Sequence, residues 1–122
     1  MKIMNCVEKG HRGEDLAAAF LFAKGYRILT RNWRIKAGEI DIIALDGETL
    51  VFCEVKSRSS TCFGTGAEAV DARKQRKILQ VAKLYLQRYN LWNQRCRFDV
   101  VEILQPTQRE PQIRHFMNAF SG

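Results

Sequence analysis

Residues 38–56 read GEIDIIALDGETLVFCEVK, and this stretch decides the fold. Two apolar runs rich in β-branched residues flank Asp46-Gly47, a dipeptide that favours a two-residue hairpin turn. The stretch therefore predicts two antiparallel strands joined by a tight turn. With Asp46 and Gly47 at the centre of that turn, Leu45 is expected opposite Glu48.

The predicted register brings three ionisable side chains to one face of the hairpin. Counting outward from the turn places Asp41 opposite Phe52 and Glu39 opposite Glu54. Side chains alternate between the two faces of a strand, and directly opposed residues share a face. Asp41, Glu54 and Lys56 are therefore expected together. A three-residue loop would shift the register by one and separate Asp41 from the other two.

Two carboxylates and an ammonium group in one place need a partner, because an isolated buried charge is very unfavourable. A divalent cation is one candidate, since hard cations take oxygen ligands. A partly solvated salt bridge at the end of a sheet is the other. The triplet Glu54-Val55-Lys56 does not decide between them, because an acid two positions before a lysine is expected about once by chance at this composition.

The composition indicates one basic globular domain. The chain has 122 residues, 46% of them hydrophobic, and a net charge of +7, which favours a polyanionic partner such as nucleic acid. The four cysteines contain no Cys-x-x-Cys pair, which argues against structural zinc. The chain shows neither a signal-peptide pattern nor an apolar run of bilayer length. We therefore expect a cytoplasmic protein without a membrane partner.

Helical spacing of apolar residues predicts one helix over residues 13–24 and another over residues 71–89. Gly25 is a stop signal for the first helix, and Asp71 is a plausible N-cap of the second. Glu14 would lie in a first turn, where the helix dipole favours an anion. Its alternative role is to reach the sheet face and orient a metal-bound water. Further strands are expected over residues 26–35, 97–104 and 113–116.

Basic residues gather near the predicted carboxylates. A solvated helix surface explains the cluster at the start of the second helix, but a basic helix start beside such a site would also hold a phosphate backbone. Gln75 points in the same direction as Ile78, toward the sheet, where it could touch the site. His115 has no partner spaced for a metal and receives no catalytic role. The residues expected to contact nucleic acid are Arg34, Arg58, Arg73, Lys74, Arg76 and Lys77.

The predicted order of elements resembles the restriction-endonuclease-like nuclease core. The closer resemblance is to the YraN family of small bacterial proteins, predicted nucleases that are distantly similar to archaeal Holliday-junction resolvases. It spans about residues 12–104. The motifs that carry it are Gly13-Glu14, Gly25-Tyr26-Arg27-Ile28-Leu29, Arg31-Asn32-Trp33-Arg34, Gly38-Glu39-Ile40-Asp41, Glu54-Val55-Lys56, Lys74-Gln75-Arg76 and Arg97-Phe98-Asp99-Val100-Val101.

This resemblance implies an α/β fold, a mixed β-sheet flanked by helices in the order αβββαββ. It also implies a single nuclease-like domain over residues 1–122, with its core at about residues 12–104. The implied activity is metal-dependent hydrolysis of phosphodiester bonds in structured or branched DNA, such as a Holliday junction. A homodimer is one expected form, because two strands must be cut.

The resemblance also implies roles for individual residues. Asp41 and Glu54, together with the Val55 carbonyl, would bind Mg²⁺ or Mn²⁺, and Lys56 would meet the attacking water or the charge developing on the phosphate. Glu14 would complete the catalytic set, with Gln75 and Glu39 as accessory residues. The chain departs from the superfamily pattern in having Ile40 rather than proline before Asp41.

Two other functions are compatible with the residues. One is a non-catalytic nucleic-acid-binding module that keeps a nuclease fold. The other is a structural or partner-binding protein in which the carboxylates and lysines form a plain ion network.

Overall fold

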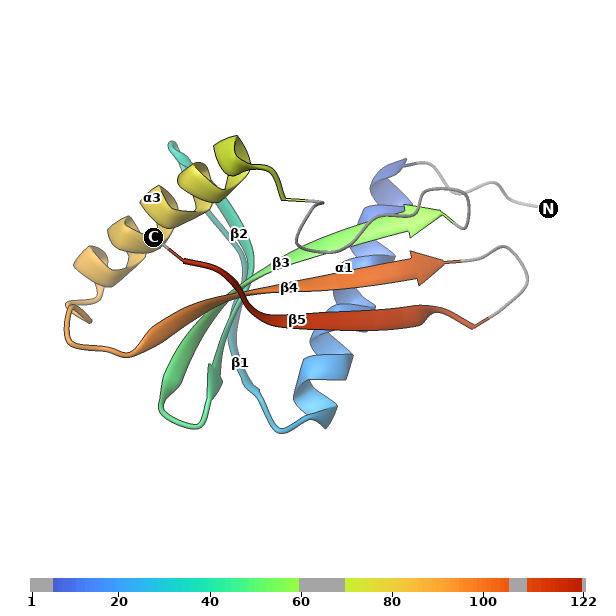
Figure 1. Cartoon of the computed structure of the whole chain (residues 1–122), viewed down its shortest axis with the longest axis horizontal. Coiled ribbons are helices and arrows are strands. Elements are labelled where there is room, and N and C mark those ends of the chain that lie inside the picture. The colour runs from blue at the N-terminus through green and yellow to red at the C-terminus, as the bar shows by residue number, and fades with distance from the viewer. Residues whose placement is uncertain (1–5, 60–69, 106–109, 122) are drawn as a thin grey trace.

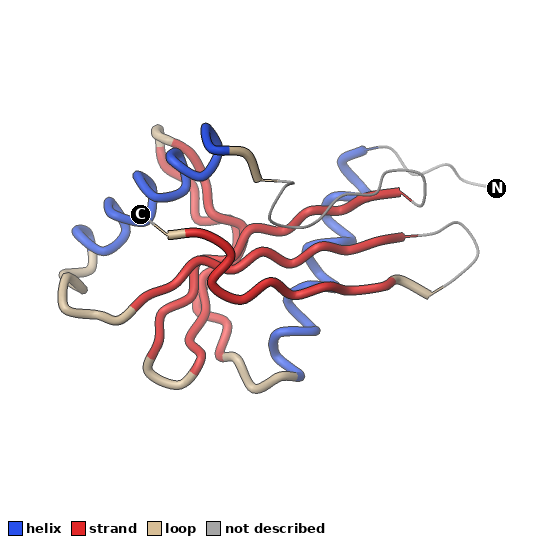
Figure 2. The backbone as a smooth tube through the Cα atoms, in the orientation of Figure 1, coloured by secondary structure: helices blue, strands red, loops and turns tan. Residues whose placement is uncertain are grey.

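The computed structural model describes residues 6–59, 70–105 and 110–121 (Figure 1). Its order of elements is the predicted αβββαββ, and Figure 2 traces the path of the chain through them. The elements are α1 (Cys6–Ala23), β1 (Arg27–Ile35), β2 (Gly38–Asp46), β3 (Thr49–Ser59), α3 (Ala72–Arg88), β4 (Cys96–Gln105) and β5 (Gln112–Phe120).

The five strands form one sheet in the order β1-β2-β3-β4-β5. The β3–β4 pair is parallel and the other pairs are antiparallel, so the sheet is mixed, as predicted. A parallel pair needs a crossover connection, and α3 lies on the crossover between β3 and β4. In Figure 1, α1 passes behind the sheet and α3 lies over its left half.

Each helix covers its own apolar cluster on one face of the sheet. Phe52 belongs to the cluster that packs against α3, whereas Val51 and Cys53 belong to the cluster that packs against α1. This alternation along β3 assigns the next residue, Glu54, to the α3 face. Two central strands that are apolar on both faces thus carry a charged group onto the side covered by the start of α3.

The first helix begins at Cys6, seven residues before the predicted start. Glu14 therefore lies within α1 and not in its first turn, so the helix dipole does not explain it. The predicted stop is confirmed. Gly25 has a φ of 98° and donates its N–H to Phe22 O, while Tyr26 N donates to Leu21 O, both at 3.0 Å. These two bonds form a Schellman cap.

The hairpin turn lies one residue later than predicted, which shifts the pairing of the two strands by two residues. Asp46 pairs with Thr49 and Leu45 with Leu50, so Gly47 and Glu48 are the central turn residues. Gly47 has a φ of 59°, which is what the first position of a type II′ turn requires. The predicted pairings of Leu45 with Glu48, Asp41 with Phe52 and Glu39 with Glu54 are wrong. Asp41 and Glu54 still lie on the same face of the sheet, as predicted, because a register shift of two residues leaves each side chain on the same side of its strand.

The remaining boundaries also need correction. The third strand continues to Ser59 beyond the expected end at Lys56, and the last strand covers Gln112–Phe120 where residues 113–116 were expected. The extra length of β5 lets Phe120 stack on Phe98, with ring centroids 5.2 Å apart. The Asp71 N-cap of α3 is confirmed, since its side chain accepts a hydrogen bond from Lys74 N at 2.9 Å. Within the described ranges, no helix is long and apolar enough to cross a bilayer.

Candidate functional site

Asp41 and Glu54 meet between the two central strands. Ile42 pairs with Cys53, and one further step along both strands reaches Asp41 and Glu54. Val55 donates its backbone N–H to Asp41 Oδ2 at 2.8 Å, and the Asp41 carboxyl group lies close enough to Glu54 for the charge of Glu54 to raise the pKa of Asp41. The structure thus brings together the two acids that the sequence placed on one face.

The environment of Asp41 favours its neutral form. Burial is the largest cause, the negative charge of Glu54 is the next, and together they raise the pKa of Asp41 to about 7. The hydrogen bond from Val55 N lowers this pKa and only partly offsets the other two causes. Near neutral pH Asp41 is therefore only partly ionised, and the two acids together carry less than two negative charges. A cation bound between them would favour the ionised form of Asp41.

Lys74 reaches this pair from the first turn of α3. Its Nζ lies 2.6 Å from Glu54 Oε1, and the Glu54 side chain is only 7% exposed whereas that of Lys74 is 43% exposed. Burial alone would lower the pKa of Lys74, but its hydrogen bond and attraction to Glu54 outweigh burial and raise it. An ammonium group thus occupies a position that suits a cation beside Glu54.

Lys56 lies on the same strand face as Glu54 and next to Lys74. Burial and the neighbouring Lys74 ammonium lower the pKa of Lys56, and the attraction of Glu54 and Asp41 does not fully compensate. Of the two lysines, Lys56 therefore gives up its proton more readily. The site thus combines two acids with two lysines, of which Lys74 has a raised pKa and Lys56 a lowered one.

Glu14 approaches the site from α1. Its Oε1 accepts hydrogen bonds from Asn32 Nδ2 at 2.8 Å and from Arg31 Nε at 3.2 Å. Asn32 adopts a positive φ of 53°, a left-handed conformation that asparagine tolerates better than most residues. The charge of Glu14 also contributes to the raised pKa of Asp41. Glu14 thus acts on Asp41 through space while β1 holds its carboxylate.

Gly13 explains how α1 comes so close to the sheet. A Cβ atom at this position would lie 1.8 Å from Ser57 Oγ and 3.1 Å from Ser57 Cβ. Only glycine allows the helix backbone to pack directly on β3 without a rearrangement. The dipeptide Gly13-Glu14 therefore combines a close approach with a carboxylate directed at β1.

The two accessory residues have partners away from the carboxylate pair. Gln75 Nε2 donates to Val70 O at 2.7 Å, which ties the start of α3 to the preceding segment. Glu39 Oε2 lies 2.7 Å from Arg34 Nη2. Neither of these contacts includes Asp41 or Glu54, and the accessory roles of Gln75 and Glu39 stay predictions.

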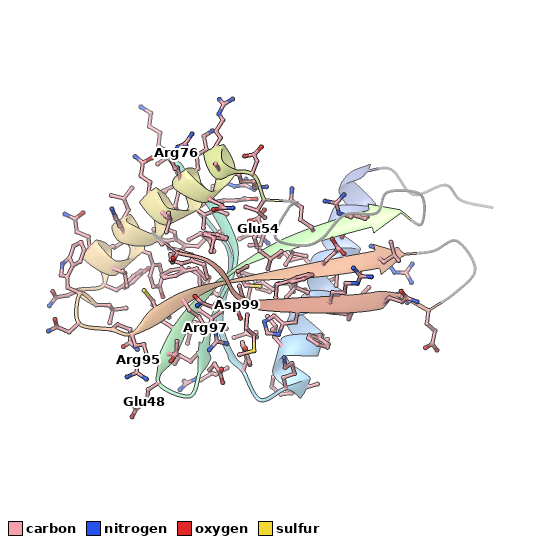
Figure 3. All side chains as sticks on the ribbon, in the orientation of Figure 1. Glu48, Glu54, Arg76, Arg95, Arg97 and Asp99 are labelled. Carbon is pink, nitrogen blue, oxygen red and sulfur yellow. The ribbon has the colours of Figure 1, made fainter. Side chains whose placement is uncertain are left out.

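The predicted nucleic-acid contacts divide into two groups. Arg34 is bonded to Glu39, and Arg58 Nε lies 3.2 Å from Glu102 Oε2. The cations of α3 are less engaged. A pocket of about 330 Å³ lies between the β1–β2 turn and α3, and its lining includes Arg73, Lys74 and Lys77. Figure 3 shows Arg76 on the outer side of α3, directed away from the sheet, and Glu54 near the start of that helix.

A divalent ion at this site would depend on few protein ligands. Among the described residues, no group of three or more His, Cys, Asp or Glu side chains is placed to hold a metal. The carboxyl groups of the partly buried Asp41 and the buried Glu54 nevertheless form a hard-oxygen donor set, and Lys74 shows that a cation fits beside Glu54. The residues present therefore fit Mg²⁺ or Mn²⁺ whose remaining ligands are water, a carbonyl or substrate.

Sequence reasoning missed a second charged cluster, centred on Asp99. This fully buried acid lies 2.7 Å from His115 Nε2 and accepts hydrogen bonds from Arg97 Nε and Asn118 N, both at 3.0 Å. Lys24 Nζ lies 2.8 Å from His115 Nδ1. Since an ammonium group only donates, Nε2 carries the proton that His115 donates to Asp99.

This second cluster is closed to substrate. The His115 side chain is only 3% exposed, and Arg97 also bonds to Asp46 in the hairpin. Figure 3 shows Arg97 and Asp99 together near the centre of the molecule. The absence of a catalytic role for His115 remains a prediction, but its contacts are structural. The sequence did hold one signal for this cluster, which is the acid Asp99 within the otherwise apolar part of the predicted strand, Phe98-Asp99-Val100-Val101.

Fold and site together define a class of small mixed-sheet α/β protein in which a buried and a partly buried acid lie side by side next to a basic helix start. Comparison with known sequences gives the family. The chain belongs to the Uncharacterised protein family UPF0102, whose model matches residues 13–103. This confirms the family expected from the motifs, while the description of the family names no activity. Glu14, Asp41, Glu54, Lys56 and Lys74 all lie within the matched range.

Similar proteins occur in distant bacteria. A UPF0102 protein of Symbiobacterium thermophilum is 50% identical over 111 residues, which cover 91% of this chain and 94% of the relative. One from Clostridioides difficile is 47% identical over 117 residues, covering 96% of this chain and 100% of the relative. One from Caldanaerobacter subterraneus is 43% identical over 122 residues, covering 98% of this chain and 100% of the relative. The match therefore extends over essentially whole chains.

Proposed function

We propose that this protein is a metal-dependent endonuclease of the restriction-endonuclease-like type that hydrolyses phosphodiester bonds in structured or branched DNA. The observation that carries the proposal is the meeting of Asp41 and Glu54 on adjacent central strands, where the charge of Glu54 helps to raise the pKa of Asp41. A structural core has no need of such a pair, because the burial of Asp41 and the nearby charge of Glu54 both disfavour the ionised form of Asp41.

Asp41 and Glu54 would hold Mg²⁺ or Mn²⁺ through their side-chain oxygens, with the Val55 carbonyl as a further ligand. The bound ion would polarise the phosphodiester and lower the pKa of a bound water. The hydrogen bond from Val55 N fixes the orientation of the Asp41 carboxylate before any ligand arrives. Preorganised ligands of this kind are what an ion-assisted reaction requires.

Lys56 would face the reacting phosphate. Its ammonium group can donate to a phosphate oxygen, and its lowered pKa allows it to release a proton more easily than an ordinary lysine. Glu14 serves as a positioning residue, because its charge acts on Asp41 while Arg31 and Asn32 hold it in place.

The charge distribution supports nucleic acid as the substrate. The chain carries a net charge of +7, and Arg73, Arg76 and Lys77 form no ion pair with any described residue. Cations on a helix start bind the phosphate backbone and do not read bases. We therefore infer low sequence specificity and a preference for the shape of a DNA branch or flap.

A cleavage assay tests this function. The whole chain is incubated with linear, flapped and four-way-junction DNA and with matching RNA, with Mn²⁺ or with EDTA. We expect Mn²⁺-dependent cleavage of branched DNA that is lost in Glu54→Gln and retained in Glu48→Gln, a matched change of an exposed acid in the hairpin turn. Equal activity of the Glu54→Gln preparation would indicate a contaminating nuclease. Equal cleavage of linear and branched DNA would remove the shape preference.

One observation favours a second candidate, a non-catalytic module. The 2.6 Å contact between Lys74 and Glu54 already neutralises one acid without a metal, as an ion network would. A calorimetric titration with Mn²⁺ separates the two functions. The endonuclease predicts saturable heat that depends on Asp41 and Glu54, whereas the module predicts none.

A further inference from the structure

Lys74 lies on the boundary between two features of the molecule. On one side it contacts the buried Glu54, and on the other it lines the pocket between α3 and the β1–β2 turn. Its side chain is 43% exposed, so it can reach solvent as well as the acid. Long lysine side chains place the charged end in either environment with little change along the stem.

The pocket has the chemistry of a phosphate site. Ile78 and Val81 supply apolar lining, and Arg73 and Lys77 supply positive charges that form no ion pair with the described residues. The two acids in the lining are already engaged, since Glu39 pairs with Arg34 and Asp71 caps the N–H of Lys74. Two positive charges without an ion-pair partner among the described residues therefore favour an anion as the occupant.

The size of the pocket narrows the class of ligand. A volume of about 330 Å³ is at the lower end for ligand sites and suits one sugar–phosphate unit. No aromatic side chain of the described residues belongs to the lining, so these residues offer no platform for a stacked base. The apolar lining can pack against a sugar while the cations hold its phosphate.

We propose that Lys74 exchanges partners. In the resting protein it neutralises Glu54, and when a divalent cation takes Glu54 it turns into the pocket and binds, with Arg73 and Lys77, the phosphodiester next to the one that reacts. Two cations cannot share the Glu54 carboxylate without repulsion, and a phosphate in the pocket compensates the displaced ammonium group. Metal and nucleic acid therefore strengthen each other's binding. This inference rests on the proposed function.

The first arm of the test measures metal binding without nucleic acid. Mn²⁺ is titrated calorimetrically into the whole chain and into Lys74→Met, Lys74→Gln, Lys74→Arg and Lys83→Met. We expect Lys74→Met and Lys74→Gln to bind Mn²⁺ at least about fivefold more tightly than the parent chain, because the competing cation is gone. Lys74→Arg keeps that cation, and Lys83→Met changes an exposed lysine of the same helix outside the pocket, so neither should bind more tightly.

The second arm tests the pocket. Binding of a fluorescent four-way DNA junction in EDTA is followed by anisotropy at several salt concentrations. The pair Arg73→Ala and Lys77→Ala should weaken binding by about tenfold or more and reduce the salt slope by about two. The pair Lys83→Ala and Arg88→Ala removes the same charge from the same helix but lies outside the pocket, and it should have a clearly smaller effect.

The outcomes separate this inference from the function on which it rests. If neither the parent chain nor the Lys74 variants bind Mn²⁺, the metal-dependent function is wrong. If the parent binds Mn²⁺ and Lys74→Met and Lys74→Gln, both folded by circular dichroism, bind it no more tightly, the exchange is wrong while the function stands. If Lys74→Met and Lys74→Gln bind Mn²⁺ and the parent chain does not, the result supports the exchange. Equal losses for the two charge-removing pairs would overturn the pocket as a phosphate site.

Discussion

Val55 N lies 2.8 Å from Asp41 Oδ2, so a side chain of one central strand is hydrogen-bonded to the backbone of the next. This bond fixes the Asp41 carboxyl group beside Glu54 in spite of the repulsion between the two acids. Asp41 therefore contributes to the stability of the fold as well as to the candidate site. Substitutions at this position can separate its contribution to stability from its role in the site.

The Val55 bond can be isolated with two variants. Asp41→Asn keeps an oxygen that accepts from Val55 N, whereas Asp41→Ala leaves this N–H without its partner. Both variants remove the repulsion with Glu54, so we expect Asp41→Ala to be less stable than Asp41→Asn by about 1–3 kcal/mol. Urea denaturation of the two variants measures the difference. Equal unfolding free energies would show that the bond contributes nothing.

Asp41 should also make stability depend on pH. Its pKa is raised to about 7 in the folded protein, against about 4 in an unfolded chain. The folded state binds this proton more tightly, so the stability it contributes is present below pH about 4 and is lost as the pH rises to about 7. The unfolding free energy of the parent relative to Asp41→Asn should therefore fall between pH 4.5 and 8. A difference that does not vary with pH would contradict the raised pKa.

Asp99 should show the opposite dependence. Burial alone would raise its pKa, but hydrogen bonds from His115, Arg97 and the Asn118 N–H outweigh burial and lower it. The stability from this lowered pKa is present above pH about 4 and is lost as the pH falls through the folded-state pKa. Asp99→Asn should reduce this acid sensitivity and cost about 3–5 kcal/mol at neutral pH, because Arg97 and His115 lose a buried partner.

Denaturation of the parent and Asp99→Asn at pH 7 and pH 3 tests this effect, with Glu48→Gln as the control. Glu48 is an exposed acid in the hairpin turn, so its substitution should leave stability nearly unchanged at both pH values. A loss for Asp99→Asn no larger than that for Glu48→Gln would show that the Asp99 cluster does not stabilise the fold.

Gly13 should be sensitive to the smallest possible enlargement. In Gly13→Ala the new methyl group would overlap Ser57 Oγ, and we expect a loss of about 1–3 kcal/mol in unfolding free energy. Ser57 Oγ is buried and makes no hydrogen bond within the described chain, so Ser57→Ala alone should cost little. The double variant should recover part of the loss, because the closer of the two contacts is removed. Denaturation of all four proteins tests the cycle, and additive losses would contradict the contact.

Local patterns predicted the order of elements and the convergence of Asp41 and Glu54. The register was wrong by two residues because Gly47 takes the first turn position, yet the period of a strand kept both acids on one face. The stop at Gly25 was predictable because a positive φ after a helix favours glycine. These features depend on neighbouring residues, which is why the sequence alone could reveal them.

Features that join distant segments were not predictable. The sequence predicted Lys74 only as a phosphate contact. Its ion pair with Glu54 could not be predicted, because it depends on where the start of α3 lies relative to β3. The Asp99 cluster combines residues from β4, β5 and the segment after α1, whose meeting no local spacing encodes. The early start of α1 was missed because residues 6–10 contribute no regular apolar spacing.

The most direct test of the central claim locates the ion. Mn²⁺ is added in small substoichiometric amounts to ¹⁵N-labelled protein, and paramagnetic broadening is followed for every backbone amide. We predict that broadening is strongest at Asp41, Glu54 and Val55, is weakest toward Gly47 in the hairpin turn and Arg88 at the far end of α3, and disappears in Glu54→Gln. Broadening centred elsewhere, or unchanged in Glu54→Gln, would contradict a metal site built from Asp41 and Glu54.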